Sequence, residues 1–339
     1  MKAIVYSEFG SPDVLRLEEA AKPKPKPREI LVRVRAASVN FGDIMARSFR
    51  SVTPRGFNML FPFWLFAKIS LGWRKPRLRI LGNELAGEVE AVGRDVTRFK
   101  PGDRVFAYTG QRFGAYAEYC RVSERAAVAH MPANLSLEEA AVIPYGAVMA
   151  LALLRKADLK PGQKILINGA SGGIGAAAVQ VANHLGAEVT AVCGGPRTGY
   201  VLALGADRVI DYAEQDFTRN GETYDVIFDV LGRAPLSLCR RSLAPRGVLL
   251  HASFKMRHLL AMVRTSLFRG RRVICALAPG SLEDLLAVAE MVEAGKIRGI
   301  VDRRFPMELA AEAHRYIEAG HRKGSVVVLM APVAEEDGR

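Results

Sequence analysis

Short apolar runs alternate with longer stretches of helical periodicity through the middle of the chain. The apolar runs predict buried parallel strands at 164–168, 188–193, 208–211, 225–230, 246–251 and 272–277. Between most of these runs, apolar residues recur at the three- and four-residue spacing of a helix. Alternating strands and helices are typical of a doubly wound parallel sheet. We therefore expect an α/β fold with a Rossmann domain over residues 133–277, which opens with a helical stretch at 136–156.

The two ends of the chain show a different pattern. Short strands interrupted by glycine and proline are predicted at 2–6, 29–36, 84–92 and 104–108, as in a compact, mostly antiparallel β domain. Beyond Pro279, the pattern predicts helices at 281–294 and 307–319 and strands at 299–305 and 325–330. We expect these late elements to complete the first domain, which would then comprise 1–132 and 278–332. Residues 333–339 are expected to form a disordered tail.

A glycine-rich turn between the first two parallel strands is the most specific local motif. Gly169, Gly172, Gly173 and Gly175 let the backbone turn sharply and approach a phosphate closely. The helix that follows would direct its N-terminal amides and its dipole toward an anion. The competing interpretation is a glycine-rich turn without a ligand. Because a strand precedes the turn and a helix and second strand follow it, the motif predicts a dinucleotide cofactor.

The end of the second strand indicates which dinucleotide. NAD-specific sites carry an acid there that binds the adenosine ribose. After Cys193 no carboxylate follows until Asp207, whereas Arg197 could bind a 2′-phosphate. We therefore expect NADPH as the cofactor.

The composition of the chain indicates its cellular compartment but does not identify its binding partner. The chain has 339 residues, four single cysteines and a formal net charge of +13. That charge favours a phosphorylated cofactor, an acidic membrane surface or nucleic acid, or it is simply solvated surface. No RNA-binding motif is visible, so nucleic acid is not expected. The chain shows no signal-peptide pattern and no apolar run of roughly 18 residues, so we expect a cytoplasmic protein.

Segments from end to end of the chain carry a resemblance to a known family. They lie at 1–6, 37–43, 82–93, 99–106, 168–175, 204–212, 224–232 and 324–328. They resemble the zinc-independent quinone oxidoreductase branch of the medium-chain dehydrogenase/reductase superfamily. The resemblance implies a GroES-like, mostly-β catalytic domain, an inserted Rossmann domain and an active-site cleft between them. It also implies a homodimer that reduces small apolar quinones or α,β-unsaturated carbonyls by direct hydride transfer from NADPH.

The resemblance assigns roles in the catalytic domain. Zinc-dependent members place a cysteine near Asn40 and a histidine at Asn83, and amides at both positions predict that no metal is bound. Without a Lewis acid, the reaction needs a hydrogen-bond donor for the developing oxyanion. The resemblance implies Asn40 as that donor. Asp43 would position the local loop or the cofactor, or would only cap a turn. Arg47 could pair with Asp43 or reach an anionic substrate.

The cofactor contacts are implied in the same way. Tyr212 matches a family tyrosine near the 2′-phosphate. The full expected set is Gly169, Ser171, Gly172, Gly173, Ile174, Gly175, Arg197, Tyr212, Leu231 and Ser253. One departure is Met149, which stands where relatives carry a threonine near the nicotinamide. A thioether accepts only weak hydrogen bonds, so Met149 would change how the nicotinamide is held.

Residues 50–79 form an insertion relative to compact quinone reductases. Five large aromatic side chains occur within 57–66, and Trp73 and a basic flank follow. Three interpretations stay open: a lid over an apolar pocket, a dimer contact, or a peripheral membrane contact through 57–73. Residues 257–272 likewise combine large apolar side chains with arginines. A nonenzymatic alternative also stays open, namely an NADPH-binding redox sensor or a basic membrane- or RNA-associated protein.

Overall fold

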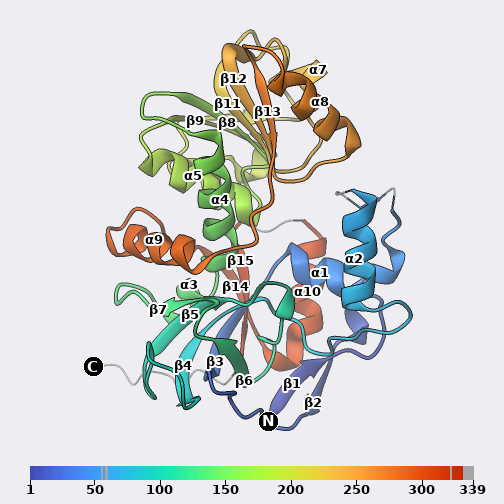
Figure 1. Cartoon of the computed structure of the whole chain (residues 1–339), viewed down its shortest axis with the longest axis vertical. Coiled ribbons are helices and arrows are strands. Elements are labelled where there is room, and N and C mark those ends of the chain that lie inside the picture. The colour runs from blue at the N-terminus through green and yellow to red at the C-terminus, as the bar shows by residue number, and fades with distance from the viewer. Residues whose placement is uncertain (55, 58–59, 321–322, 331–339) are drawn as a thin grey trace. The chain divides into compact units, whose positions relative to one another are not determined.

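The structure is a computed structural model that describes residues 1–54, 56–57, 60–320 and 323–330 (Figure 1). The chain forms two units. The first comprises residues 1–53, 65–145 and the segment from 280 onward, and the second comprises 54–64 and 146–279. The predicted disordered tail at 333–339 lies outside the described residues. Among the residues that are described, no helix combines the length and apolar character needed to cross a membrane.

The first unit is built on a mostly antiparallel seven-stranded sheet. Its order is β14-β15-β3-β4-β5-β7, and β6 also pairs with β3. The strands are β3 (Glu29–Val39), β4 (Glu84–Val92), β5 (Arg104–Tyr108), β6 (Tyr119–Ser123), β7 (Ala127–His130), β14 (Val301–Pro306) and β15 (Ser325–Leu329). A separate hairpin joins β1 (Lys2–Val5) to β2 (Arg16–Glu19). The late strands β14 and β15 therefore complete the sheet that the early strands begin, as the pattern predicts.

The helices of the first unit are short. They are α1 (Phe41–Arg47), α3 (Leu137–Ala140), α9 (Leu282–Glu293) and α10 (Ala310–Glu318). The Ser136 hydroxyl caps α3 by accepting the Glu139 amide N–H at 3.2 Å. Because α3 contacts β3 and β4, residues 133–145 pack within the first unit, although their pattern groups them with the Rossmann domain. Pro144 starts a new helix, so the predicted helical stretch is two helices.

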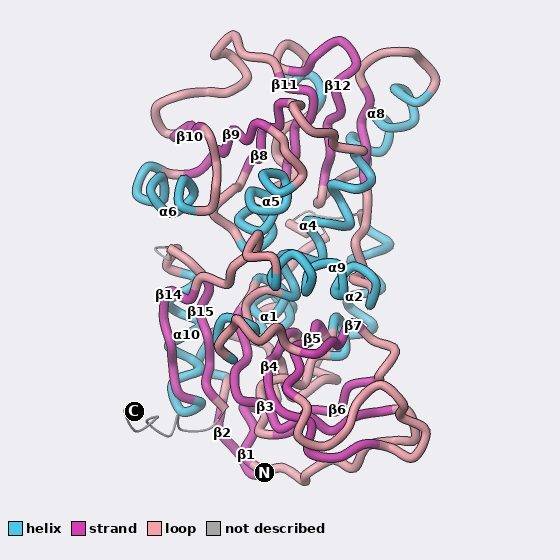
Figure 2. The backbone as a smooth tube through the Cα atoms, turned by 90° about the vertical axis from the view of Figure 1, so that its left-hand side faces the viewer, coloured by secondary structure: helices cyan, strands magenta, loops and turns pink. Residues whose placement is uncertain are grey.

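The second unit contains a six-stranded, fully parallel sheet. Its order is β10-β9-β8-β11-β12-β13, and Figure 2 shows most of these strands side by side. The strands are β8 (Lys164–Asn168), β9 (Glu188–Cys193), β10 (Arg208–Asp211), β11 (Tyr224–Asp229), β12 (Leu243–His251) and β13 (Arg272–Cys275). The order reverses between β8 and β11, and such a switch point opens a crevice at the carboxyl ends of the strands. The predicted Rossmann topology is confirmed.

Helices accompany this sheet because the strands are buried on both faces. Successive residues of a strand face opposite sides of the sheet, and Ile165, Leu166 and Ile167 of β8 are all fully buried. The helices are α4 (Pro144–Ala157, which begins in the first unit), α5 (Gly173–His184), α6 (Thr198–Ala203), α7 (Leu236–Cys239) and α8 (Met256–Ser266). Helix α2 (Phe61–Leu71) is divided between the units at residue 64.

Candidate active site

The turn after β8 has the geometry of a phosphate-binding turn. Gly169 has a φ of +90°, which glycine adopts without strain. A Cβ on Gly175 would lie 2.1 Å from the carbonyl oxygen of Gly169, so only glycine lets α5 begin this close to the strand. Gly172 caps α5 without a side-chain hydrogen bond, which suits the first-turn amides to an anion. One turn thus contains the predicted residues Gly169, Ser171, Gly172, Gly173, Ile174 and Gly175.

Two further turns lie against the glycine turn. A Cβ on Gly169 would lie 2.9 Å from Cγ of Leu231, so the Leu231 side chain packs directly over this glycine. A Cβ on Gly232 would lie 2.4 Å from the carbonyl oxygen of Ser253, so the turns after β11 and β12 also touch. The predicted residues Leu231 and Ser253 therefore join the glycine turn at the carboxyl edge of the sheet.

Arg197 and Tyr212 lie together at the end of β9. The Arg197 amide donates to the carbonyl oxygen of Gly194 at 2.9 Å. The Tyr212 hydroxyl lies 3.2 Å from the place that a Cβ on Gly194 would take. Asp211 joins them, because its Oδ2 lies 2.5 Å from the corresponding Cβ place on Gly195. This carboxylate comes from the end of the neighbouring strand β10, so it does not stand in the sequence directly after β9.

The charges at this turn oppose each other. Burial raises the pKa of the Cys193 thiol, Asp211 raises it further, and Arg197 lowers it. Both charged groups are thus close enough to act on the same sulfur atom. A phosphate bound at this turn would be attracted by Arg197 and repelled by Asp211.

A row of polar side chains, half-buried at Asn168 and buried at Asp229 and His251, supports these turns. Asn168, Asp229 and His251 end β8, β11 and β12 and are paired in register. Asn168 Nδ2 donates to Asp229 Oδ1 at 3.0 Å, and the Ala234 amide donates to Oδ2 at 2.7 Å. His251 Nδ1 lies 3.3 Å from the same carboxylate. Burial acts to raise the pKa of Asp229, but these neighbours outweigh it and hold the pKa below its usual value.

A second histidine covers the first. The rings of His251 and His258 stack at a centroid distance of 4.4 Å, and both side chains are buried. Burial lowers the pKa of His258 to about 4, and His251 adds to the effect. His258 Nδ1 accepts the amide N–H of Lys255 at 3.1 Å. Because His258 stacks on His251, this bond holds the start of α8 against the polar side chains that end β8, β11 and β12. The sequence does not reveal this cluster, because it depends on strand register and on the packing of α8.

In the first unit, two carboxamides form a second candidate site. Asn40 caps α1, and Asn83 precedes β4. Asn40 Nδ2 donates to Asn83 Oδ1, and Asn83 Nδ2 lies 3.4 Å from Asn40 Oδ1. The Gly42 amide also donates to Asn40 Oδ1 at 2.9 Å. Both amides are buried, so each fixes the orientation of the other.

Asp43 holds the backbone around this amide pair. Its Oδ2 accepts the Asn40 amide N–H at 3.0 Å, and its Oδ1 accepts the Gly82 amide N–H at 2.9 Å. Burial raises the pKa of Asp43 to about 7, although these hydrogen bonds act to lower it. These contacts make Asp43 a cap of α1 that also holds the loop at Gly82, and its expected role toward the cofactor stays a prediction.

Glu84 is a second buried carboxyl group beside the pair. Its Oε1 accepts the Ser38 hydroxyl, and its Oε2 accepts the Tyr145 amide N–H at 2.8 Å. Burial raises the pKa of Glu84 to about 7; Asp43 contributes in the same direction, and the hydrogen bonds oppose it. Carboxyl groups with such pKa values hold or release a proton near neutral pH. In the sequence, Glu84 stands out only as a carboxylate without companion metal ligands.

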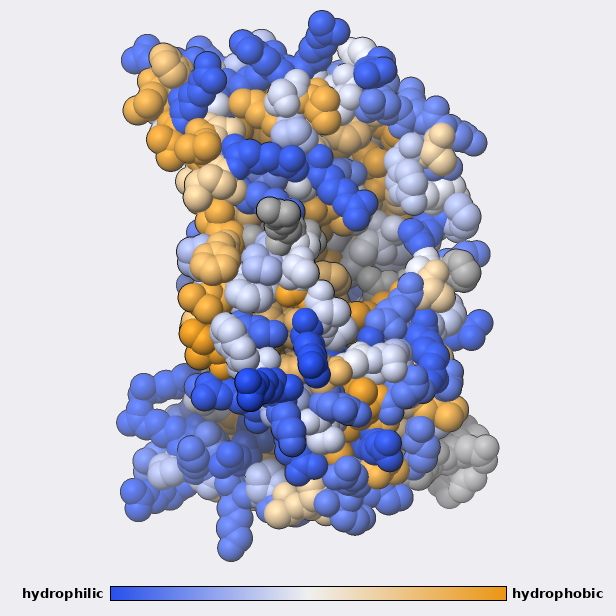
Figure 3. All heavy atoms as spheres, turned by 90° about the vertical axis from the view of Figure 1, so that its right-hand side faces the viewer, coloured by the Kyte–Doolittle hydropathy of each residue, from blue (hydrophilic) through white to orange (hydrophobic). Residues whose placement is uncertain are grey.

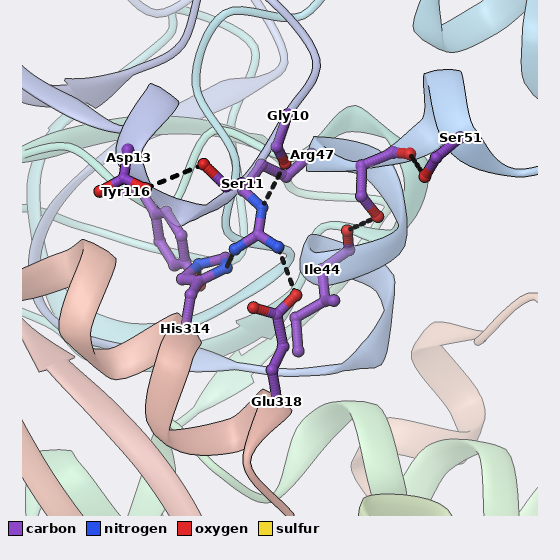
Figure 4. A network of polar contacts seen from close by, with 10 residues as sticks. Gly10, Ser11, Asp13, Ile44, Arg47, Ser51, Tyr116, His314 and Glu318 are labelled. Atoms are coloured by element: carbon purple, nitrogen blue, oxygen red, sulfur yellow. Dashed lines mark hydrogen bonds and ion pairs between the residues drawn. The ribbon is translucent and has the colours of Figure 1, made fainter.

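Arg47 pairs with Glu318 and not with Asp43. Its buried guanidinium forms an ion pair with the Glu318 carboxylate and donates to the carbonyl oxygen of Gly10 at 3.2 Å (Figure 4). It also lies 3.2 Å from His314 Nδ1. The Arg47 side chain extends toward α10, which accounts for the difference from the expected pairing. A cavity of about 530 Å³ borders this network.

The network continues toward the amide pair. A guanidinium only donates, so His314 Nδ1 accepts and the ring proton lies on Nε2. Nε2 lies 3.3 Å from the Tyr116 hydroxyl, which donates to the carbonyl oxygen of Ser38 at 3.3 Å. Burial lowers the pKa of His314 to about 3, and Arg47 adds to this effect, so the ring stays neutral. Helix α10 is thereby tied to the end of β3, next to Asn40.

Metal ligands are not grouped in the described part of the chain. Across residues 1–54, 56–57, 60–320 and 323–330, no three His, Cys, Asp or Glu side chains lie close enough together to hold an ion. The four cysteines are free thiols, three of them buried.

The two features that distinguish this chain from its relatives, Met149 and the insertion at 50–79, involve α4 and α2. Met149 is half-buried on α4. In the insertion, Phe61, Phe66 and Trp73 are each more than half exposed. Lys68 is buried, with its Nζ 5.6 Å from the Phe49 ring and 5.9 Å from the Trp73 ring. Residues 55, 58 and 59 of the insertion lie outside the described residues. The lid, dimer and membrane interpretations of 57–73 all stay predictions.

Two protein-family models match the chain. A model described as "Alcohol dehydrogenase GroES-like domain" matches residues 26–133, and one described as "Zinc-binding dehydrogenase" matches residues 204–328. The chain is 33% identical over 347 residues to "Quinone oxidoreductase" of Pseudomonas aeruginosa, covering 97% of this chain and 99% of that protein. It is 29% identical over 346 residues to "NADPH-dependent alkenal/one oxidoreductase, chloroplastic" of Arabidopsis thaliana, covering 98% of this chain and 80% of that protein.

A solved structure shows the same architecture. The quinone oxidoreductase from Coxiella burnetii superposes with a TM-score of 0.82 at 28% identity, covering 98% of this chain and 99% of that one. With the GroES-like match over β4, β5, β6 and β7, this confirms the predicted GroES-like domain with its inserted Rossmann sheet. The chain belongs to the medium-chain dehydrogenase/reductase superfamily, in its quinone oxidoreductase-like branch.

Proposed function

We propose that this protein is an NADPH-dependent, zinc-independent oxidoreductase that reduces quinones or α,β-unsaturated carbonyls by direct hydride transfer. Membership of the branch supports nicotinamide-dependent oxidoreduction, and the relatives' names suggest quinone and enone substrates. The observation that carries the proposal is the buried amide pair of Asn40 and Asn83. It stands where zinc-dependent members carry metal ligands, and amides are seldom zinc ligands.

The glycine turn fits a dinucleotide. A Cβ would fill the space beside Gly169 and Gly175, and the first turn of α5 has no side-chain cap. This turn would hold the pyrophosphate, Leu231 and Ser253 would contact the nicotinamide end, and Arg197 and Tyr212 would hold the 2′-phosphate. When bound, NADPH supplies the hydride.

The amide pair would act on the substrate oxygen. Addition of hydride to a quinone, or to the β-carbon of an enone, leaves negative charge on the carbonyl oxygen. A preorganised hydrogen-bond donor stabilises that charge without a metal. Asp43 and Gly42 fix Asn40, and Asn40 fixes Asn83, so the donors do not have to reorganise. A proton completes the reduction, and Glu84 is a group beside the pair that can hold one at neutral pH.

The test is NADPH oxidation against a panel of quinones and enones, with the protein assayed before and after treatment with a zinc chelator. We expect turnover of at least one quinone or enone, at a rate that the chelator does not change. We also expect no oxidation of simple alcohols with NADP⁺. Tight NADPH binding without turnover across the panel would overturn the proposal in favour of a binding protein. Activity that returns only with added zinc would overturn zinc independence.

A further inference from the structure

The positive charge of the chain is concentrated in one stretch of the second unit. Residues 230–282 contain ten Lys and Arg residues and no Asp or Glu. This stretch therefore carries +10 of the formal net charge of +13, and the other 286 residues carry only +3. Eight of the ten basic side chains are exposed. A merely solvated surface would intersperse both signs of charge, so the concentration indicates an anionic partner.

Within this stretch, α8 turns an apolar face to the solvent. Met256, Leu260, Val263 and Leu267 follow one another at three- or four-residue intervals, so they lie on one side of the helix. Their exposed fractions are 58%, 63%, 57% and 74%, and Phe268 beyond them is 70% exposed. In the upper part of Figure 3, hydrophobic side chains lie at the surface beside hydrophilic ones. The basic residues of this segment with exposed side chains are Arg257, Arg264, Arg269 and Arg272.

The opposite side of α8 is committed to the sheet. The His258 side chain is buried. Met262 Sδ accepts the Cys275 amide N–H at 3.4 Å, and Thr265 Oγ1 accepts the Val273 amide N–H at 3.0 Å. These two amides belong to β13, the last strand in the sheet order. The apolar face therefore cannot turn inward without breaking the contacts that cover this edge.

We propose that this face of α8, with the arginines around it, docks on the surface of an anionic lipid bilayer. A helix that lies in the interface buries its apolar side chains at the headgroup–acyl boundary. Arginines beside it bind the headgroup phosphates, to which guanidinium geometry is well matched. This inference does not rest on the proposed activity, although it would hold a reductase of apolar substrates where such substrates dissolve.

A second copy of the chain fits this face less well. Two copies that met at this face would bring their exposed arginines together, and like charges at contact repel each other. Strand addition at β13 would have to displace the bonds from its amides to Met262 and Thr265. Nucleic acid would satisfy the arginines, but its phosphate backbone offers no apolar layer for the aliphatic side chains of α8.

The insertion at 57–73 is a weaker candidate for the same role. It exposes aromatic side chains, but its flanking charge is partly used within the chain. Arg79 pairs with Glu18 at 3.3 Å, and Arg77 donates to the carbonyl oxygen of Ile69 at 2.9 Å. The segment around α8 therefore combines exposed apolar surface with more unneutralised charge.

The test is cosedimentation of the full chain with vesicles of phosphatidylcholine alone or with one-third phosphatidylglycerol, at low and high salt. We expect binding to the anionic vesicles only, and release by high salt. A triple variant, Arg264→Gln, Arg269→Gln and Arg272→Gln, should bind about a hundredfold more weakly, because each arginine contributes about fivefold. A double variant, Leu260→Gln and Leu267→Gln, should lose at least about tenfold.

Matched controls come from the same unit. Leu202→Gln on α6, where the side chain is 45% exposed, and Arg219→Gln, whose side chain is 85% exposed, should bind as the unmodified chain does. Absence of binding to anionic vesicles at low salt would overturn the proposal, as would binding that survives both sets of substitutions. A dimer that dissociates in the leucine variant without any vesicle binding would assign the face to a second copy. Binding of single-stranded RNA without vesicle binding would assign the arginines to nucleic acid.

Discussion

The glycine turn of the second unit and the amide pair of the first are built from different parts of the polypeptide. At the turn, the critical neighbours are backbone atoms such as the Gly169 carbonyl oxygen, 2.1 Å from where a Cβ on Gly175 would lie. At the amide pair, they are buried side chains, and two of these, Asp43 and Glu84, have pKa values raised to about 7 by burial. The turn should therefore respond to added volume, and the pair to lost hydrogen bonds and to pH.

Removing the carboxamide of Asn40 should have the largest effect. Asn40→Ala deletes the proposed donor to the substrate oxygen, and loss of one such donor lowers kcat by about 10²- to 10³-fold. The affinity for NADPH should stay unchanged, because the glycine turn is untouched. Steady-state kinetics with a quinone or enone, together with NADPH titration, measure both. If NADPH affinity fell in parallel with kcat, the two sites would not be separable in this way.

The pH dependence of stability should distinguish the pair from the turn. The pKa of Glu84 is about 7 in the folded chain against an ordinary value of 4.5, so the folded state binds more protons between these pH values. The contribution of Glu84 to the free energy of unfolding therefore falls as the pH rises from 4.5 to 7, by up to about 3 kcal/mol. In Glu84→Gln the fall in the free energy of unfolding should be smaller. It should not vanish, because Asp43, whose pKa is also raised to about 7, still titrates over this range.

Urea unfolding at pH 5 and pH 8 measures the difference for both proteins. The comparison uses the change between the two pH values, because glutamine also alters the hydrogen bonds to Ser38 and Tyr145. An equal change in both proteins would show that Glu84 does not titrate as described.

Added volume should disable the turn. Gly175→Ala would bring a Cβ within 2.1 Å of a backbone oxygen, so α5 must shift, at about 1–3 kcal/mol in stability. NADPH affinity should fall with it. Gly199→Ala on α6 is the matched control, because a Cβ there meets nothing within 4 Å. Thermal unfolding and NADPH titration of both glycine variants measure the difference. Equal unfolding temperatures and equal NADPH affinities would contradict the close approach at Gly175.

The smallest effect concerns cofactor preference. Arg197→Ala should reduce the preference for NADPH over NADH by about tenfold, and Asp211→Asn should raise it, because the two groups act on the same turn with opposite charge. The ratio of kcat/KM for the two cofactors measures this. A ratio that neither variant changes would place the 2′-phosphate elsewhere.

The turn was largely predictable from the sequence, and the pair was not. Glycine spacing between a strand and a helix specifies local backbone geometry, so six neighbouring cofactor residues could be assigned from residues 164–185 alone. Asn40 was assigned through family resemblance. That Asn83 bonds to it, and that Glu84 shares the buried environment, requires the pairing of β3 with β4, which lie far apart in the chain.

The contacts that the sequence did not reveal share this cause. Asp211 reaches the turn after β9 from a neighbouring strand, and Asp229 meets His251 through strand register. Arg47 finds Glu318 on α10, more than 270 residues later. Local pattern gives the elements and their order, but contacts between distant elements depend on packing that periodicity does not encode.

Deuterium transfer is the sharpest test of direct, zinc-independent hydride transfer by this protein. The chelator-treated protein would reduce an enone with NADPH deuterated at both C4 positions, and the product would be examined by nuclear magnetic resonance. We expect deuterium on the β-carbon of the product, at a rate that zinc removal does not alter and that Asn40→Ala lowers by about 10²-fold or more. Product without deuterium at that carbon would rule out direct hydride transfer, and transfer that needs added zinc would rule out zinc independence.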